Sequence, residues 1–76
     1  MLSKERIEVQ AKVIKALSRG MFLVELKNGL KPLVYVSGKM RMHSIKVAVG
    51  DIVTVELSPY DLTRGRIIFR KKQDAK

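Results

Sequence analysis

Apolar and polar residues alternate along most of this chain, which is the pattern of half-buried β-strands. The first alternating stretch runs from Ile7 to Val13, with Glu, Gln and Lys between the apolar positions. Ile14 and Leu17 then break the phase. Because one extra residue bends a strand and reverses the side-chain alternation, this pattern predicts a long first strand with a β-bulge.

A hairpin is predicted around Asn28-Gly29, since both residues tolerate the positive φ of a tight turn. Alternation over residues 21–27 and 31–36 gives the second and third strands. Pro32 has no N–H to donate to a neighbouring strand, so the hairpin should lose one bond or open into a wider loop. The inward-facing side chains of this pair are Phe22, Val24, Leu26, Val34 and Val36.

The apolar spacing changes after Ser37-Gly38, which ends the third strand. Met42, Ile45 and Val49 are spaced closer to a helix than to a strand. This spacing predicts one or two helical turns within residues 39–47, with Met42 and Ile45 on one face.

Alternation returns in residues 52–57 and 66–70, which predict the fourth and fifth strands. Between them, Pro59 follows a Ser that can cap a type I turn. The inward-facing set of these two strands is Val53, Val55, Leu57, Ile67 and Phe69.

Five short strands with a helical segment between the third and fourth are typical of the OB-fold, an all-β barrel. We therefore expect one OB-fold domain over residues 7–70, with flexible tails at 1–6 and 71–76. An SH3-like barrel is the main alternative, although it usually lacks the helical insertion. In an OB-fold, loops 18–20 and 58–65 would flank the oligonucleotide-binding face of the second and third strands.

Composition excludes several classes of protein. The chain of 76 residues has no cysteine and one histidine, so it can form no disulfide and offers little to a metal ion. Its apolar runs reach only four residues, far short of the roughly 20 that cross a bilayer. It has no nucleophile-and-base pair and no glycine-rich phosphate loop. We expect neither enzymatic activity nor a metal or cofactor.

The net charge of +9 is unevenly distributed. Residues 37–50 and 62–73 contain no Asp or Glu, and all seven acids lie elsewhere. Segregated positive charge attracts polyanions, whereas mixed charge mainly keeps a protein soluble. The distribution predicts a nucleic-acid-binding domain.

The first basic segment contributes a row of side chains. Lys39, His43 and Lys46 would share one face of the predicted helix. Arg41 points elsewhere, and its planar guanidinium suits a phosphate or a base edge. We interpret this row as a grip on phosphates, the alternative being a solvated helix face.

The second basic segment places arginines on the last strand. Arg66 and Arg70 would line one face of it, with Arg64 just before. Tyr35 and Tyr60 could stack on bases, but two aromatic platforms are few for a protein that binds single strands. The combination favours phosphate and shape recognition of a folded RNA.

Several strings in these segments are distinctive. They are SGKMR (37–41), GDIVTVEL (50–57), SPYDL (58–62) and RGRIIFR (64–70), preceded by MFLVELKNG at 21–29. In this order the chain resembles bacterial translation initiation factor one along nearly its whole length.

The resemblance implies a monomeric OB barrel that binds the small ribosomal subunit and does not associate with a membrane. Its location would be the cytoplasm of bacteria or a plastid stroma. It implies contact with the decoding helix of the ribosomal RNA and with an adjacent ribosomal protein at the aminoacyl-tRNA site. There the factor would block premature tRNA entry, acting with initiation factors two and three.

The resemblance also implies that the RNA-contacting residues of the family lie at the matching positions of this sequence. Ser44 and Lys46 depart from the tyrosine and arginine that the family commonly has there. Arg19 lies in a contact region without matching a fixed family residue, and His43 and Lys46 come from the charge pattern. The predicted RNA-binding set is Arg19, Gly38, Lys39, Met40, Arg41, His43, Lys46, Tyr60, Arg64, Gly65, Arg66 and Arg70.

Two other functions fit the same composition. A general OB-fold RNA chaperone would melt mispaired helices, although the low aromatic count argues against it. A barrel that binds only proteins would not need its cations. Both make predictions that differ from those of an initiation factor.

Overall fold

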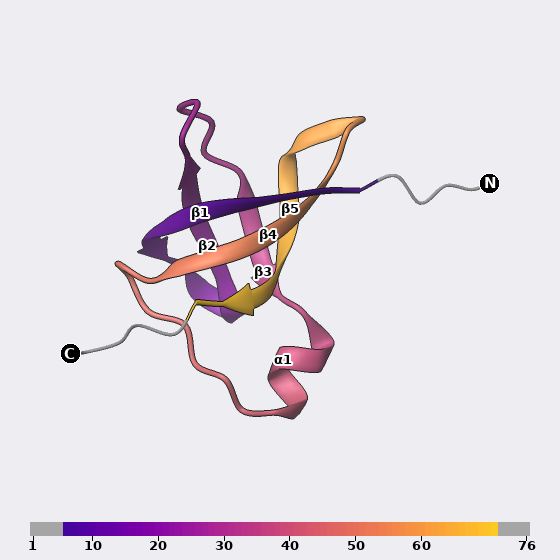
Figure 1. Ribbon diagram of the computed structural model, residues 1–76. Coiled ribbons are helices and arrows are strands. Elements are labelled where there is room, and N and C mark those ends of the chain that lie inside the picture. The colour runs from indigo at the N-terminus through magenta and orange to yellow at the C-terminus, as the bar shows by residue number, and fades with distance from the viewer. Residues whose placement is uncertain (1–5, 72–76) are drawn as a thin grey trace.

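The computed structural model describes residues 6–71 and shows a closed barrel of five strands with one short α-helix (Figure 1). The predicted all-β OB-fold is confirmed. A 3₁₀ turn, η1 (Ser18–Gly20), joins the first two strands. The strands and the helix are β1 (Ile7–Ala16), β2 (Met21–Leu26), β3 (Leu33–Val36), α1 (Gly38–Met42), β4 (Ile52–Ser58) and β5 (Asp61–Arg70).

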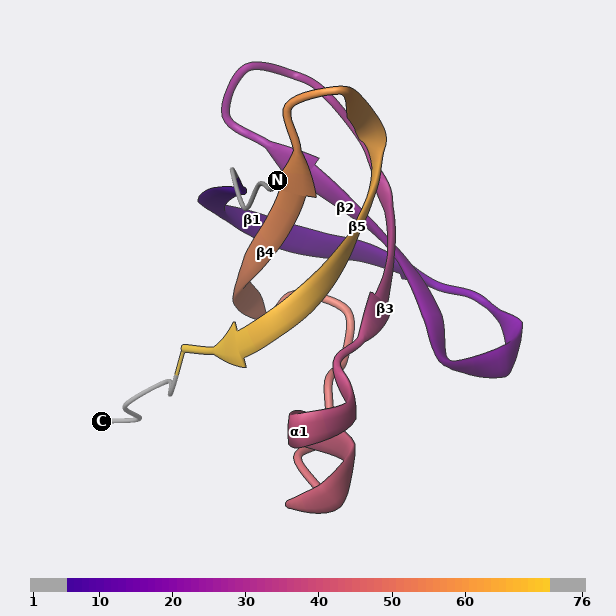
Figure 2. The ribbon, with the colours of Figure 1, turned by 90° about the vertical axis from the view of Figure 1, so that its right-hand side faces the viewer.

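The barrel closes in the order β1-β2-β3-β5-β4. β1 is long enough to pair with β2 through its second half and with β4 through its first half. The register with β2 skips Ile14, because Val13 lies opposite Val24 and Lys15 opposite Leu23. This is the predicted β-bulge, and it bends β1 so that one strand serves two neighbours. β3 and β5 close the other side as a parallel pair (Figure 2).

The β2–β3 connection is wider than a two-residue hairpin. Gly29 takes a φ of +92°, which disfavours a side chain, and the Asn28 Oδ1 accepts a hydrogen bond from the Leu30 backbone N–H at 3.0 Å. Pro32 remains outside β3, which begins at Leu33, and its carbonyl accepts from the Val24 N–H at 3.2 Å. The chain thereby uses the acceptor that proline keeps and needs no donor from it.

The core is built mainly from branched aliphatic residues on the inward-facing sides of the strands. All of the predicted inward residues of β4 are buried, as are Val24, Leu26 and Val34. Phe22 and Val36 pack against the core while keeping some exposure. The buried apolar residues are Ala11, Val13, Val24, Leu26, Val34, Met40, Val53, Val55, Leu57 and Ile67.

The expectation that Phe69 faces inward is wrong, since this residue is 59% exposed. The register explains the error. Val55 lies opposite Ile67 while Thr54 lies opposite Phe69, so Ile68 is an extra residue in β5. This bulge reverses the alternation and turns Phe69 outward.

The same bulge separates Arg66 from Arg70, and the expectation that they share one face of the strand is wrong. Arg66 lies opposite Glu56 on the outside of the barrel. Arg70 lies opposite Val53, whose side chain is buried, and its Nη1 is 3.9 Å from Asp51 Oδ2. The two arginine side chains therefore lie on different sides of the β5 strand.

α1 has between one and two turns, as predicted, but it ends before Ile45. Ser37 caps it, its Oγ accepting a hydrogen bond from the Met40 N–H at 3.3 Å, and the helix ends at Met42. Ser44 takes a φ of +56°, which a continuing helix does not allow. Ile45 and Val49 consequently lie beyond the helix, and the residue that reaches the core is Met40, at 3% exposure.

A methyl group at Gly65 would collide with the barrel wall. A Cβ built there would lie 2.5 Å from Leu57 Cδ2 and 2.6 Å from the Glu56 carbonyl oxygen. Because the backbone oxygen cannot move aside cheaply, we expect Gly65→Ala to lower the free energy of unfolding by about 1–3 kcal/mol. Urea denaturation followed by circular dichroism measures this change, and Gly38→Ala, whose Cβ would meet nothing within 4 Å, is the matched control. An equal cost at both positions would contradict the close approach.

Arg6 and Lys71, which the sequence places in the tails, make defined contacts: Arg6 pairs with Glu56, and the Lys71 N–H donates to the Ile52 carbonyl at 2.9 Å. The remaining tail positions, 1–5 and 72–76, lie outside the described residues. Within residues 6–71, no helix has the length and apolar character needed to cross a membrane.

Candidate nucleic-acid interface

A groove runs over the outside of the barrel between the β4–β5 loop and the surfaces of β2, β3 and β5. Its floor follows the strand register: Met21 lies beside Tyr35, and Tyr35 beside Arg66. Arg66 in turn lies opposite Glu56. The groove is lined by Arg6, Met21, Leu33, Tyr35, Glu56, Leu57, Ser58, Tyr60, Asp61, Arg64, Gly65 and Arg66.

The β4–β5 loop forms one wall of the groove and is held by short local hydrogen bonds. Ser58 Oγ accepts from the Tyr60 N–H at 3.1 Å, as the sequence predicted for this turn. Asp61 Oδ1 accepts from the hydroxyl and the backbone N–H of Thr63, and these bonds hold the pKa of the Asp61 carboxyl below its usual value. The loop thereby presents Tyr60, which is 89% exposed, as a free aromatic face.

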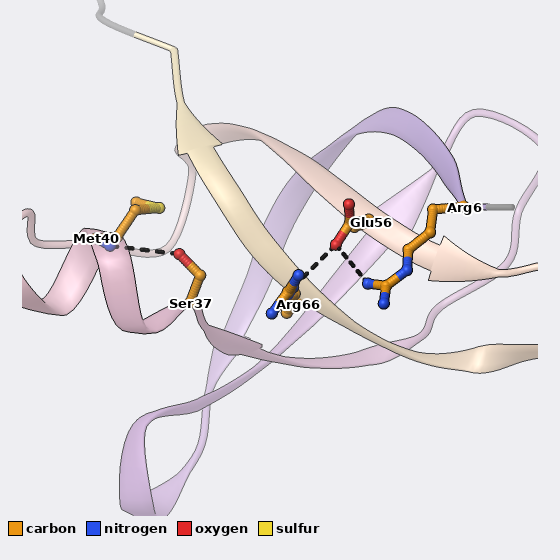
Figure 3. Close-up of polar contacts among 5 residues, drawn as sticks. All are labelled: Arg6, Ser37, Met40, Glu56 and Arg66. Atoms are coloured by element: carbon orange, nitrogen blue, oxygen red, sulfur yellow. Dashed lines mark hydrogen bonds and ion pairs between the residues drawn. The ribbon is translucent and has the colours of Figure 1, made fainter. Parts of the chain in front are cut away.

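An ion-pair network lies on the floor. Glu56 Oε1 accepts from Arg66 Nε and from Arg6 Nη1, each at 2.9 Å (Figure 3). The Glu56 side chain is 15% exposed, whereas those of Arg66 and Arg6 are 39% and 52% exposed. The bond to Glu56, with a smaller contribution from the neighbouring Tyr35, raises the pKa of the Arg66 guanidinium above its already high value, so this residue stays charged.

A second basic group lies beside the groove, and we call it the α1 cluster: Arg19, Lys39 and Arg41. Arg41 reaches from α1 to η1, since its Nη2 would lie 3.5 Å from a Cβ on Gly20. Arg19, the neighbour of Gly20, takes a φ of 62° and is exposed. Gly20 leads directly into Met21, which lines the groove, so Arg19 and the guanidinium of Arg41 lie close to this end of it.

The structure brings together only part of the predicted RNA-binding set. Four members line the groove, namely Tyr60, Arg64, Gly65 and Arg66. Arg41 reaches Gly20, the chain neighbour of Arg19, and Gly38 and Lys39 are exposed on the same helix as Arg41.

The other four predicted residues are placed differently. Met40 is a core residue, so its side chain is not presented at the surface. His43 caps the end of α1 and Lys46 lies beyond it, so the predicted helical row of Lys39, His43 and Lys46 does not form. Arg70 lies beside Asp51, away from the groove lining.

The groove also contains residues absent from the predicted set, of which Arg6, Tyr35 and Glu56 bear most on its chemistry. Tyr35 carried a signal, since it is an aromatic residue on the outward phase of its strand. Glu56 also lies on the outward phase, opposite Arg66, but recognising the pair requires the register between β4 and β5. The contact between Arg6 and Glu56 joins positions 50 residues apart, and no local pattern announces it.

Two exposed tyrosines and several arginines around one groove are suited to stacking on bases and to binding phosphates. Residues 6–71 contain no group of three or more His, Cys, Asp and Glu side chains that could hold a metal ion.

The family model for translation initiation factor 1A / IF-1 matches residues 1–76. The chain belongs to this family. Its fold is similar to the solution structure of translation initiation factor IF-1 from the Wolbachia endosymbiont strain TRS of Brugia malayi, with a TM-score of 0.77 and 42% sequence identity. That match covers 92% of this chain and 83% of the other.

The barrel also resembles part of a larger protein. The crystal structure of YjeQ from Thermotoga maritima matches with a TM-score of 0.72 and 27% identity, over 87% of this chain but 23% of that one. A barrel similar to that of this chain therefore also occurs as part of a longer protein.

Proposed function

We propose that this IF-1 family member binds the small ribosomal subunit at the aminoacyl-tRNA site, contacting the decoding helix of the ribosomal RNA and an adjacent ribosomal protein. It blocks premature entry of tRNA and acts with initiation factors two and three, as a monomer without enzymatic activity. The protein acts in the bacterial cytoplasm.

The observation that carries this proposal is the shared surface of the two basic groups. Arg64 and Arg66 line the groove, and Arg41 of the α1 cluster reaches the loop that leads into it. Their charges are concentrated on one region, where they can meet the phosphates of a folded RNA together. Tyr35 and Tyr60 add a stacking platform for one or two bases.

Chemical footprinting on small subunits tests the proposal. We expect the factor to protect nucleotides of the decoding helix and to compete with tRNA at that site. Protection confined to other regions of the subunit would contradict it. With about five phosphates contacted, log affinity should fall with log salt at a slope of roughly −3 to −5.

A general RNA chaperone is the second candidate, because OB-folds with exposed aromatic residues bind single strands. A strand-melting assay on hairpins unrelated to the ribosome separates the two. We expect no melting at concentrations that saturate the small subunit, and efficient melting would favour the chaperone.

A further inference from the structure

A carboxylate at the floor of a cationic groove is unexpected in a site for RNA. Glu56 is the least exposed member of the ion-pair network, at 15%, and faces the same groove as Arg64 and Arg66. By Coulomb's law its charge repels any phosphate that enters. Its presence therefore calls for a compensating role.

The hydrogen-bond geometry supplies that role. Arg66 donates to Glu56 through Nε, and Nε–H lies in the guanidinium plane. A hydrogen bond at Nε fixes the orientation of the guanidinium plane. It does not involve the two terminal nitrogens, Nη1 and Nη2. Within the described part of the chain, no carboxylate other than Glu56 pairs with Arg66. Figure 3 shows the rest of the guanidinium on the side away from Glu56.

Arg6 completes the arrangement from the opposite side. Its Nη1 bonds to the same Oε1 of Glu56, so one oxygen is held between two guanidinium groups (Figure 3). The two arginines together outweigh the charge of Glu56, and the floor retains positive charge.

We propose that Glu56 is a positioning residue that presents the two terminal nitrogens of Arg66 as a preoriented fork for an RNA phosphate. The proposal rests on the proposed function, since it assumes that Arg66 contacts RNA. A planar fork binds phosphate through two parallel hydrogen bonds, and fixing it in advance removes the ordering cost that binding would otherwise include.

The direction in which one substitution changes the affinity for small subunits distinguishes positioning from simple repulsion. Glu56→Gln keeps the size of the side chain and removes its charge. If Glu56 only repelled phosphate, this variant would bind small subunits more tightly. Positioning predicts about three- to tenfold weaker binding. Glu25→Gln removes the same charge from an exposed position of β2 outside the groove, and we expect less than about a twofold change.

A double-mutant cycle with Arg66→Ala completes the test. In the Arg66→Ala background the fork is absent, so Glu56→Gln should leave affinity unchanged or increase it slightly. Weakening by the same factor in both backgrounds would overturn the proposal, as would tighter binding by Glu56→Gln alone. Arg66→Ala alone tests the underlying function: if it binds as tightly as the wild type, Arg66 makes no RNA contact.

A measurement on the unmodified protein guards against misfolding of the variants. In ¹⁵N–¹H spectra of the free factor, the Arg66 Nε–H should exchange with water about tenfold more slowly than that of Arg64, which has no side-chain acceptor within residues 6–71. Equal exchange rates for the two groups would show that Glu56 does not hold Arg66, and would overturn the proposal.

Discussion

Replacing Lys39, Arg41 and Arg64 together by Glu is expected to abolish binding to the small ribosomal subunit. If each side chain makes one charge-assisted hydrogen bond to RNA, worth about 1.5 kcal/mol, the loss of all three weakens binding about 1000-fold. The introduced carboxylates add repulsion to this loss. Filter binding or sedimentation with purified subunits at fixed salt measures the effect.

The triple variant should fold normally. All three side chains are exposed, and none forms an ion pair within the described residues. Exposed charges contribute at most about 1 kcal/mol each to stability. Arg66 is left unchanged because a Glu there would face Glu56 across the β4–β5 pair.

A matched control reverses three cations elsewhere. Lys15, Lys27 and Lys31 are also exposed and lie outside both the groove and the α1 cluster. Their replacement by Glu changes the net charge equally, so loss of binding in the first variant alone would locate the interface. If the first variant still binds the small subunit, the result would instead favour a barrel that binds only proteins.

The strands were predictable because alternation reports burial directly. Each inward position of β4 lies between more exposed neighbours, so only one phase could bury the apolar surface. The bulge in β1 was readable for the same reason, since Ile14 interrupts a clear alternation. Where the pattern has contrast, the sequence determines which side chains face inward.

The end of β5 lacks that contrast. Ile67, Ile68 and Phe69 are all apolar, so either phase satisfies the pattern and the bulge at Ile68 leaves no trace in the sequence. The end of α1 was also hidden, because five residues are too few to establish a helical period.

The candidate site was only partly predictable, for a different reason. Its basic residues stand out by charge, and the acid-free segments identified them. The groove, however, is assembled from four strands, the β4–β5 loop and Arg6, and its central contact joins Glu56 to Arg66 and Arg6. Such pairings depend on the barrel register, which local patterns of charge and hydropathy do not encode.

The bulge in β5 predicts a large difference between two neighbouring apolar residues. Ile67 is fully buried, whereas Phe69 is 59% exposed. We expect Ile67→Ala to lower the free energy of unfolding by about 2–5 kcal/mol, because it removes buried methyl groups and leaves a cavity. Phe69→Ala should cost less than about 1 kcal/mol, although it deletes the larger side chain.

Urea denaturation of both variants at 25 °C measures this contrast. Small domains are stable by about 5–15 kcal/mol, so Ile67→Ala could leave a large unfolded fraction, and Ile67→Val, expected to cost about 0.5–1.5 kcal/mol, keeps the comparison measurable. A cost at Phe69 equal to or above that at Ile67 would mean that β5 alternates without a bulge. Arg66 and Arg70 would then share one face of β5, and the conclusion that Arg70 lies apart from the groove would also be wrong.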